Sequence, residues 1–109
     1  MKSVHFNLSP DLEQLTDQIV RAANPERVVL FGSRAKGTFS PSSDCDIALV
    51  FKDRDQVRKG IREANRALWP RRFPIDLVGL TSETLRTGRT ALAREVARAG
   101  RPLYRKHAS

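Results

Sequence analysis

Two aspartates near the middle of the chain, Asp44 and Asp46, have the spacing of a metal-binding pair. They are separated by one residue, at the start of the apolar run 47–51, and alternate residues of a strand point to the same face of a sheet. Two ionised carboxylates about 5 Å apart repel by about 3 kcal/mol at an effective dielectric of about 20. This repulsion favours a bound cation, a shared proton or separation by solvent. A hard divalent ion such as Mg²⁺ suits two oxygen ligands best; alternatively, Asp44 caps a turn and Asp46 begins a solvated strand.

A turn just upstream of the aspartates has the composition of a phosphate-binding loop. Gly32 permits close approach by a phosphate, and the hydroxyl of Ser33 and nearby backbone N–H groups can donate hydrogen bonds to an anion. A short helix over 33–36 would add its positive end, and Arg34 and Lys36 would add charge unless they are simply solvated. The patterns of a P-loop and of a dinucleotide-binding turn are absent. The alternative is an ordinary connection between a strand and a helix.

A third carboxylate, Asp76, interrupts the apolar segment 74–80. A charge inside a strand is costly unless it has a partner. If this strand lies beside that of Asp46, the carboxylates of Asp44, Asp46 and Asp76 converge and can hold a metal, with Asp76 also placed to accept a proton. The alternative is that Asp76 faces solvent or pairs with an arginine just upstream.

The order of these features resembles the polymerase-β-like nucleotidyltransferase superfamily. The shared order is a strand, Gly-Ser-x-Ala-x-Gly, a serine-rich loop, Ser-Asp-x-Asp-Ile, a helix, and a strand with one further aspartate. Within the superfamily, the chain looks most like the minimal nucleotidyltransferases, small proteins often paired with HEPN-domain toxins in prokaryotic toxin–antitoxin modules. The resemblance covers roughly residues 27–80, and residues 100–104 are similar to the closing strand of such domains.

The resemblance implies a role for each candidate residue. Gly32 and Ser33 would bind the triphosphate of ATP, with Arg34 and Lys36 as candidate charge stabilisers. The three carboxylates would hold two Mg²⁺ ions and catalyse the reaction, with Asp76 the best candidate for a general base. In sequence order, the candidate metal- and triphosphate-binding residues are Gly32, Ser33, Arg34, Lys36, Asp44, Asp46 and Asp76.

Three functions are compatible with these residues. The first, implied by the resemblance, is transfer of AMP from ATP to a hydroxyl, most simply a tyrosine, of a HEPN-type toxin, which silences the toxin. The second is an antitoxin or adaptor that neutralises its partner only by binding. A pure binder needs no carboxylates arranged for a metal, which favours the first. The third is a transferase for a small molecule such as an aminoglycoside, or for an RNA end, and the lack of room for an acceptor domain argues against it.

The elements that must position these residues follow from the apolar patterns. Ser9-Pro10-Asp11 opens a helix that ends at Asn24-Pro25, and further helices are expected over 57–68 and 90–99, with a short turn over 81–86. Strands are expected over 27–31, 47–51, 74–80 and 100–104. The pattern predicts an α/β (α+β) domain in which a small mixed sheet carries helices mainly on one face, leaving the carboxylate face open to substrate.

Length and charge limit the setting of this chemistry. The 109 residues predict one domain, 1–109, with 20 basic and 12 acidic residues and a net charge of +8. Positive charge attracts nucleotides, nucleic acid or an acidic protein, but the aromatic residues are too scattered for a base-stacking surface. Arginines repeat every four residues on one helix face, which indicates a solvated face or a docking surface for an acidic partner or a nucleotide: Arg58, Arg62 and Arg66.

The remaining chemically reactive side chains indicate no second site. Cys45 is the only cysteine, so there is no internal disulfide, and it should point away from the aspartates into the core. His5 and His107 are expected on the surface, and Tyr104 is expected to pack in a strand instead of stacking on a nucleotide. With no signal peptide and only short apolar runs, we expect a soluble cytoplasmic protein.

Overall fold

The computed structural model describes residues 3–5, 10–32, 45–70 and 74–106. Across these ranges, one five-stranded sheet has the strand order β1-β5-β2-β3-β4. The strands are β1 (Ser3–His5), β2 (Arg27–Phe31), β3 (Cys45–Phe51), β4 (Ile75–Thr81) and β5 (Arg101–Lys106). The pairs β1/β5, β5/β2 and β2/β3 are antiparallel, whereas β3/β4 is parallel. The sheet is therefore mixed, as predicted.

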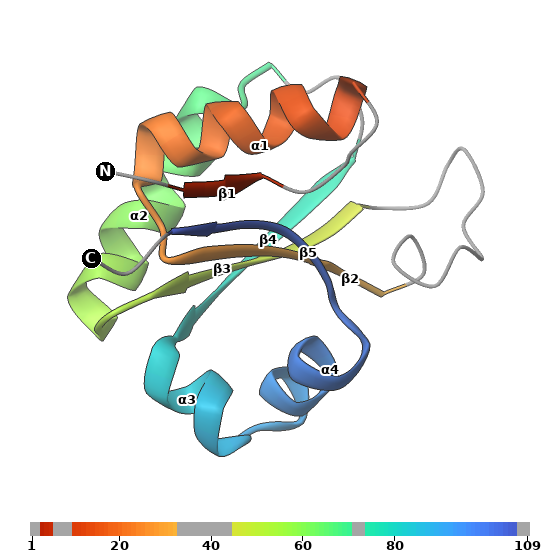
Figure 1. Cartoon of the computed structure of the whole chain (residues 1–109). Coiled ribbons are helices and arrows are strands. Elements are labelled where there is room, and N and C mark those ends of the chain that lie inside the picture. Colours follow the sequence, from red (N-terminus) through yellow and green to blue (C-terminus); the bar gives the residue numbers. More distant parts are fainter. Residues whose placement is uncertain (1–2, 6–9, 33–44, 71–73, 107–109) are drawn as a thin grey trace.

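Helices lie on both faces of the sheet (Figure 1). The two longer ones, α1 (Pro10–Ala23) and α2 (Arg54–Ala67), cover one face, which agrees with the prediction. The two shorter ones, α3 (Ser82–Thr87) and α4 (Ala91–Ala99), pack on the opposite face. The carboxylate face, expected to be open to substrate, is therefore covered in part.

Strand β3 is the centre of the fold because both of its faces are buried. Cys45, Ile47 and Leu49 point toward α1 and α2, while Ala48 points toward α3 and α4. A strand covered on both sides needs apolar side chains at successive positions, which explains the unbroken run that follows Asp46. The parallel connection from β3 to β4 passes through α2, as parallel pairs require.

Side-chain caps and a glycine set the helix ends. Gln56 N–H donates to Asp53 Oδ1 at 2.9 Å at the start of α2, and Ala93 N–H donates to Thr90 Oγ1 at 3.0 Å at the start of α4. Thr81 caps α3 in the same way, accepting from Thr84 N–H at 3.1 Å. At the other end of α4, Gly100 is the C-terminal cap, and its N–H donates to the carbonyl of Val96.

The N-terminal segment contains a strand that no apolar pattern indicated. Ser3–His5 form β1 and pair with β5, where Ser3 is in register with Lys106. The expected short helix over 33–36 and the serine-rich loop after it lie outside the described residues. No described helix is long and apolar enough to cross a membrane.

Candidate active site

Asp46 and Asp76 lie next to each other on neighbouring strands. They are register partners in the parallel β3/β4 pair, where strands are about 4.8 Å apart. Residues in register on adjacent strands point to the same face. The neighbours of Asp46 along β3, Cys45 and Ile47, pack toward α1 and α2, so the carboxylates of Asp46 and Asp76 point to the face that carries α3 and α4. We call these two residues the acidic pair.

The acidic pair is accessible from solvent. Asp46 is half-buried and Asp76 is exposed. Farther along the same face, Ala48, Val78 and Leu80 pack beneath α3 and α4. Both aspartates come before these positions in their strands, so the pair lies at the border of this apolar cluster, where Phe31 of the cluster is in register with Asp46.

Gly32 lies directly against the carboxylate of Asp46. It follows β2, whose last residue, Phe31, is in register with Asp46. A Cβ atom at Gly32 would collide with Oδ2 of Asp46 and lie 3.3 Å from its Cγ. Gly32 also has a φ of 76°, a conformation that residues with a side chain rarely adopt. The structure thus gives Gly32 a role that the sequence did not reveal, which is to leave room for Asp46.

Several predicted site residues fall outside the described part of the chain: Ser33, Arg34, Lys36 and Asp44. The phosphate-binding turn and the metal-binding role of Asp44 therefore stay predictions. The arginines considered as partners of Asp76, Arg71 and Arg72, lie outside it as well. Of the three predicted carboxylates, the structure brings together Asp46 and Asp76.

The chemistry of this donor set suits a hard divalent cation. Two carboxylates on one face supply oxygen ligands of the kind that Mg²⁺ prefers, and the absence of a side chain at Gly32 leaves room for one of these carboxylates. Within the described ranges, no group of three or more His, Cys, Asp or Glu side chains is positioned to hold a metal. A third carboxylate would have to come from Asp44, next to Cys45 in the sequence.

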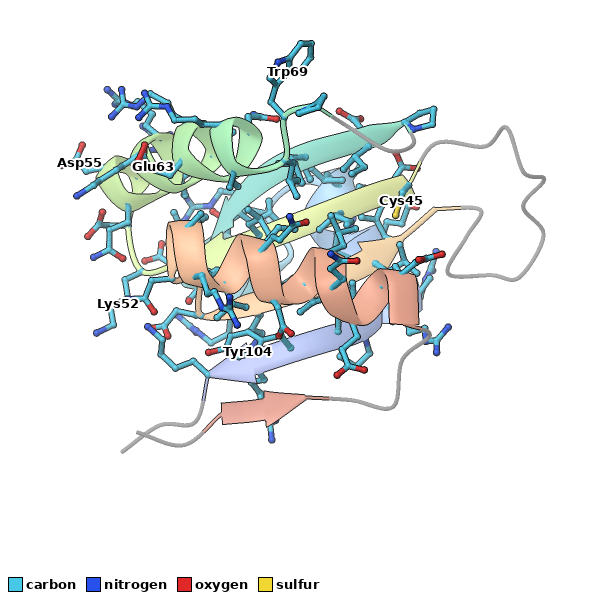
Figure 2. The ribbon with its side chains drawn as sticks, turned by 90° about the horizontal axis from the view of Figure 1, so that it is seen from above. Cys45, Lys52, Asp55, Glu63, Trp69 and Tyr104 are labelled. Atoms are coloured by element: carbon cyan, nitrogen blue, oxygen red, sulfur yellow. The ribbon has the colours of Figure 1, made fainter. Side chains whose placement is uncertain are left out.

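Two other residues lie where the sequence analysis expected. Cys45 is fully buried in the cluster beneath α1 and α2, on the face opposite the acidic pair. Tyr104, on β5, is only 4% exposed and belongs to the same cluster (Figure 2). Packing is therefore its role, and nucleotide stacking by Tyr104 is ruled out by burial.

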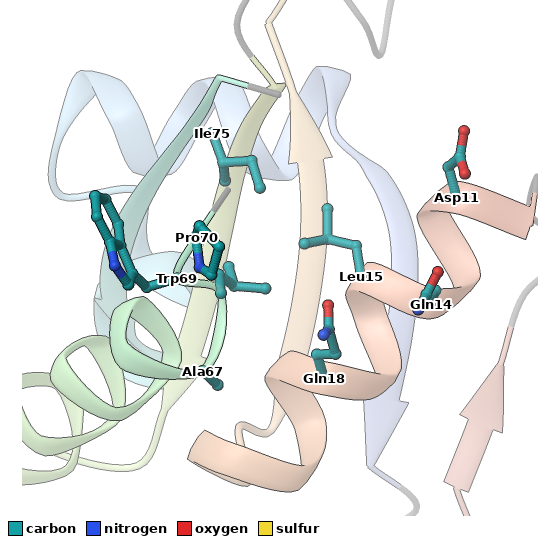
Figure 3. Close-up of a pocket in the computed structure, with 9 residues that line it drawn as sticks. Asp11, Gln14, Leu15, Gln18, Ala67, Trp69, Pro70 and Ile75 are labelled. Carbon is teal, nitrogen blue, oxygen red and sulfur yellow. The ribbon is translucent and has the colours of Figure 1, made fainter. Parts of the chain in front are cut away.

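A separate hollow lies on the far side of the sheet (Figure 3). It has a volume of about 210 Å³ and opens between α1 and the segment that follows α2, with Leu15, Pro70 and Ile75 among its lining residues. Trp69, another lining residue, is 77% exposed and projects outward just after α2 (Figure 2). Because Leu15 and Ile75 belong to the α1/α2 side, this hollow does not open onto the acidic pair.

Comparison with known proteins agrees with the geometry. The family model described as "Polymerase beta, Nucleotidyltransferase" matches residues 13–109. No curated protein matches the chain significantly. Among solved structures, a toxin–antitoxin with AMP-PNP is 28% identical, with 84% of this chain and 71% of that chain covered and a TM-score of 0.54.

Two further solved structures are similar. A mutant of the toxin–antitoxin MntA–HpeT is 26% identical, with 84% of this chain and 71% of that chain covered and a TM-score of 0.53. A putative nucleotidyltransferase from Sulfolobus solfataricus is 24% identical, with 84% and 78% covered and a TM-score of 0.57; it supports the fold alone.

Proposed function

Because the chain belongs to the polymerase beta nucleotidyltransferase family, we propose that it transfers AMP from ATP to a hydroxyl of a partner protein in an Mg²⁺-dependent reaction. The partner is a HEPN-type toxin, the acceptor hydroxyl is that of a tyrosine, and the modification silences the toxin in the cytoplasm. In this proposal the chain is the antitoxin of the pair.

The acidic pair is the observation that carries this proposal. Asp46 and Asp76 are register partners on one face, with Gly32 shaped to leave room for one of the carboxylates. Carboxylates that repel each other at this separation are stabilised by a cation between them. A protein that only binds a partner needs no carboxylates arranged for a metal.

The residues of the site have separate roles in the proposed reaction. Asp44, Asp46 and Asp76 would hold Mg²⁺, and Gly32 and Ser33 would bind the triphosphate with help from Arg34 and Lys36. Bound divalent ions at such a site lower the pKa of an attacking hydroxyl and stabilise charge on the departing pyrophosphate. Asp76, the more exposed carboxylate, would take the proton of the incoming hydroxyl.

The similar structures support the choice of nucleotide and partner. One is a toxin–antitoxin bound to AMP-PNP, a nucleotide with an adenine base and a triphosphate-like chain. Another is a mutant in which two aspartates, two positions apart, are replaced by glutamate, and Asp44 and Asp46 have the same spacing. Both similarities favour an ATP-dependent reaction on a toxin over transfer to a small molecule or to an RNA end.

The proposal is tested by labelling the partner. The purified chain is incubated with Mg²⁺, α-labelled ATP and the protein encoded by the neighbouring gene. We expect label on the partner, and we expect Asp46→Asn to reduce the labelling rate by about 100-fold or more, since removing a metal ligand costs several kcal/mol of transition-state stabilisation. Asp55→Asn, an exposed carboxylate at the start of α2, is the matched control and should label at the wild-type rate.

Two outcomes would contradict the enzyme proposal. If the wild type and Asp46→Asn both bind and silence the partner without transferring label, the chain is a binding-only antitoxin. If Asp46→Asn and Asp55→Asn reduce labelling equally, the acidic pair is not the site of the reaction.

A further inference from the structure

Strand β4 is an edge strand of the sheet that the described residues form. It pairs with β3 on one side, and no described strand pairs with it on the other. The opposite edge of the sheet is the short strand β1, whereas β4 has seven residues. A long open edge offers a row of backbone N–H and C=O groups to which another chain can pair.

The hydrogen bonds to β3 show which residues of β4 face outward. Cys45 N–H donates to Pro74 C=O at 2.9 Å, and Cys45 is in register with Ile75. In a parallel ladder with this pattern, Asp76, Val78 and Leu80 turn their backbone groups toward β3. Leu77 and Gly79 turn theirs outward, and within the described ranges these groups have no hydrogen-bond partner.

A groove with a positively charged rim runs along this edge. It has a volume of about 520 Å³ and is lined by α2, by β4 from Gly79 to Thr81, and by residues of α3 and the start of α4. Val57 and Leu92 supply apolar surface, and Arg54 and Arg58 lie on the α2 side. We call it the edge groove.

No ion pair among the described residues balances the charges of the edge groove. Its lining residues include two arginines and no carboxylate. Arg54 and Arg58 are exposed and form no ion pair with the described residues. A second copy of this chain, which itself carries a net charge of +8, would be repelled from this groove. An acidic occupant would be attracted to it.

We propose that the edge groove binds an extended, acidic segment of the partner protein, which adds to the sheet as a strand beside β4. Main-chain hydrogen bonds to Leu77 and Gly79 would hold the segment, and Arg54 and Arg58 would select its negative charge. Gly79 is three residues from Asp76 on the same strand, which is about 10 Å. A segment paired with β4 therefore passes from the groove to the acidic pair and can present a hydroxyl there.

This inference rests on the proposed function for the identity of the partner and the reaction at the acidic pair. The groove itself is tested by binding, which needs no catalysis. Affinity for the protein encoded by the neighbouring gene is measured by calorimetry with Arg54→Glu/Arg58→Glu and, as matched control, Arg62→Glu/Arg66→Glu. Both variants change the charge of α2 equally, but Arg62 and Arg66 do not line the groove. Thermal unfolding of both variants shows that they are folded.

We expect the groove variant to weaken binding at least about tenfold and the control less than about threefold, because charges that face an opposite charge across an interface contribute most. Hydrogen exchange adds a readout that charge alone does not affect: the amides of Leu77 and Gly79 should exchange more slowly when the partner is bound. Equal losses of affinity in the two variants would overturn the proposal. So would hydrogen-exchange rates at the amides of Leu77 and Gly79 that do not change when the partner binds.

Three further outcomes separate the possibilities. If a single-stranded oligouridylate binds the chain and loses affinity in the groove variant while the partner protein does not, the groove is a nucleic-acid site and the proposal is wrong. If the partner binds and protects β4 but never receives AMP, the groove assignment stands and the enzyme proposal fails. If both arginine variants transfer AMP equally and the amides of β4 are not protected, the enzyme proposal stands and the groove assignment fails.

Discussion

At the scale of single residues, Gly32 and Asp46 act as one unit. Gly32 has a left-handed backbone conformation, and the carboxylate of Asp46 fills the space where a side chain would be. Sequence alone suggested a glycine for phosphate approach, because a Gly-Ser turn after a strand is typical of anion binding. The contact with Asp46 could not be predicted, since it depends on the register of β2 against β3, where Phe31 is opposite Asp46.

Gly32→Ala should therefore damage activity more than stability. A Cβ at Gly32 must displace the carboxylate of Asp46, and a misplacement of about 1 Å at a reacting centre can cost about 100-fold in rate. The left-handed conformation adds about 1–2 kcal/mol of destabilisation. The AMP-transfer rate and urea unfolding measure the two effects.

Gly88→Ala is the matched control for Gly32→Ala. Gly88 also has a positive φ, of 64°, but a Cβ there meets only the side chain of Arg94, at 3.2 Å. Both variants should lose similar stability, and Gly88→Ala should keep wild-type activity per folded molecule. Equal activity of the two variants would show that the space beside Asp46 is unimportant.

At the scale of elements, α2 is fixed to the sheet by a glycine. Gly60 is buried in α2, and a Cβ there would collide with the ring of Phe51 on β3. The close approach of α2 to β3 fixes the position of the arginines that line the edge groove. The sequence predicted a helix here from its apolar stripe, but an isolated glycine in a helix carries no sign of what it contacts.

Gly60→Ala should destabilise the protein by about 1–3 kcal/mol, although alanine is the better helix former by about 1 kcal/mol. The reason is the overlap with the Phe51 ring. Urea unfolding measures the change. In the double variant Gly60→Ala/Phe51→Leu, the loss in free energy of unfolding should be smaller than the sum of the two single losses, because the smaller side chain relieves the overlap. Additive losses would contradict this account.

At the scale of the whole molecule, the sequence predicted the mixed sheet and the helices, but not how they divide in space. Apolar runs identified β2 and β3, which are buried, and β4, which is buried only in part, and the charged Asp76 inside the β4 run indicated a site. Strand β1 was missed because three residues without an apolar pattern form a strand only by pairing with β5 at the far end of the chain. Strand order, and with it the open edge of β4, depends on such distant contacts.

Net charge should govern how fast the partner associates. With a charge of +8 on the chain and an acidic partner segment, long-range attraction speeds encounter. We expect the association rate constant, measured by stopped flow, to fall about tenfold between about 0.05 and 0.5 M NaCl as screening increases. Arg54→Glu/Arg58→Glu should show a shallower salt dependence. A rate that is independent of salt would argue against an acidic partner.

The division of the acidic pair between an inner and an outer strand has a consequence for how the site opens. Asp46 is on β3, which has neighbours on both sides, whereas Asp76 is on β4, which has one. Outer strands fray at a lower free energy than inner ones, so β4 can detach briefly while the rest of the sheet persists. Each such event takes the two aspartates apart. Any interaction that stabilises the pairing of β4 with β3 also keeps the two aspartates together. By thermodynamic linkage, a cation that bridges the acidic pair stabilises the pairing of β4 with β3 in return.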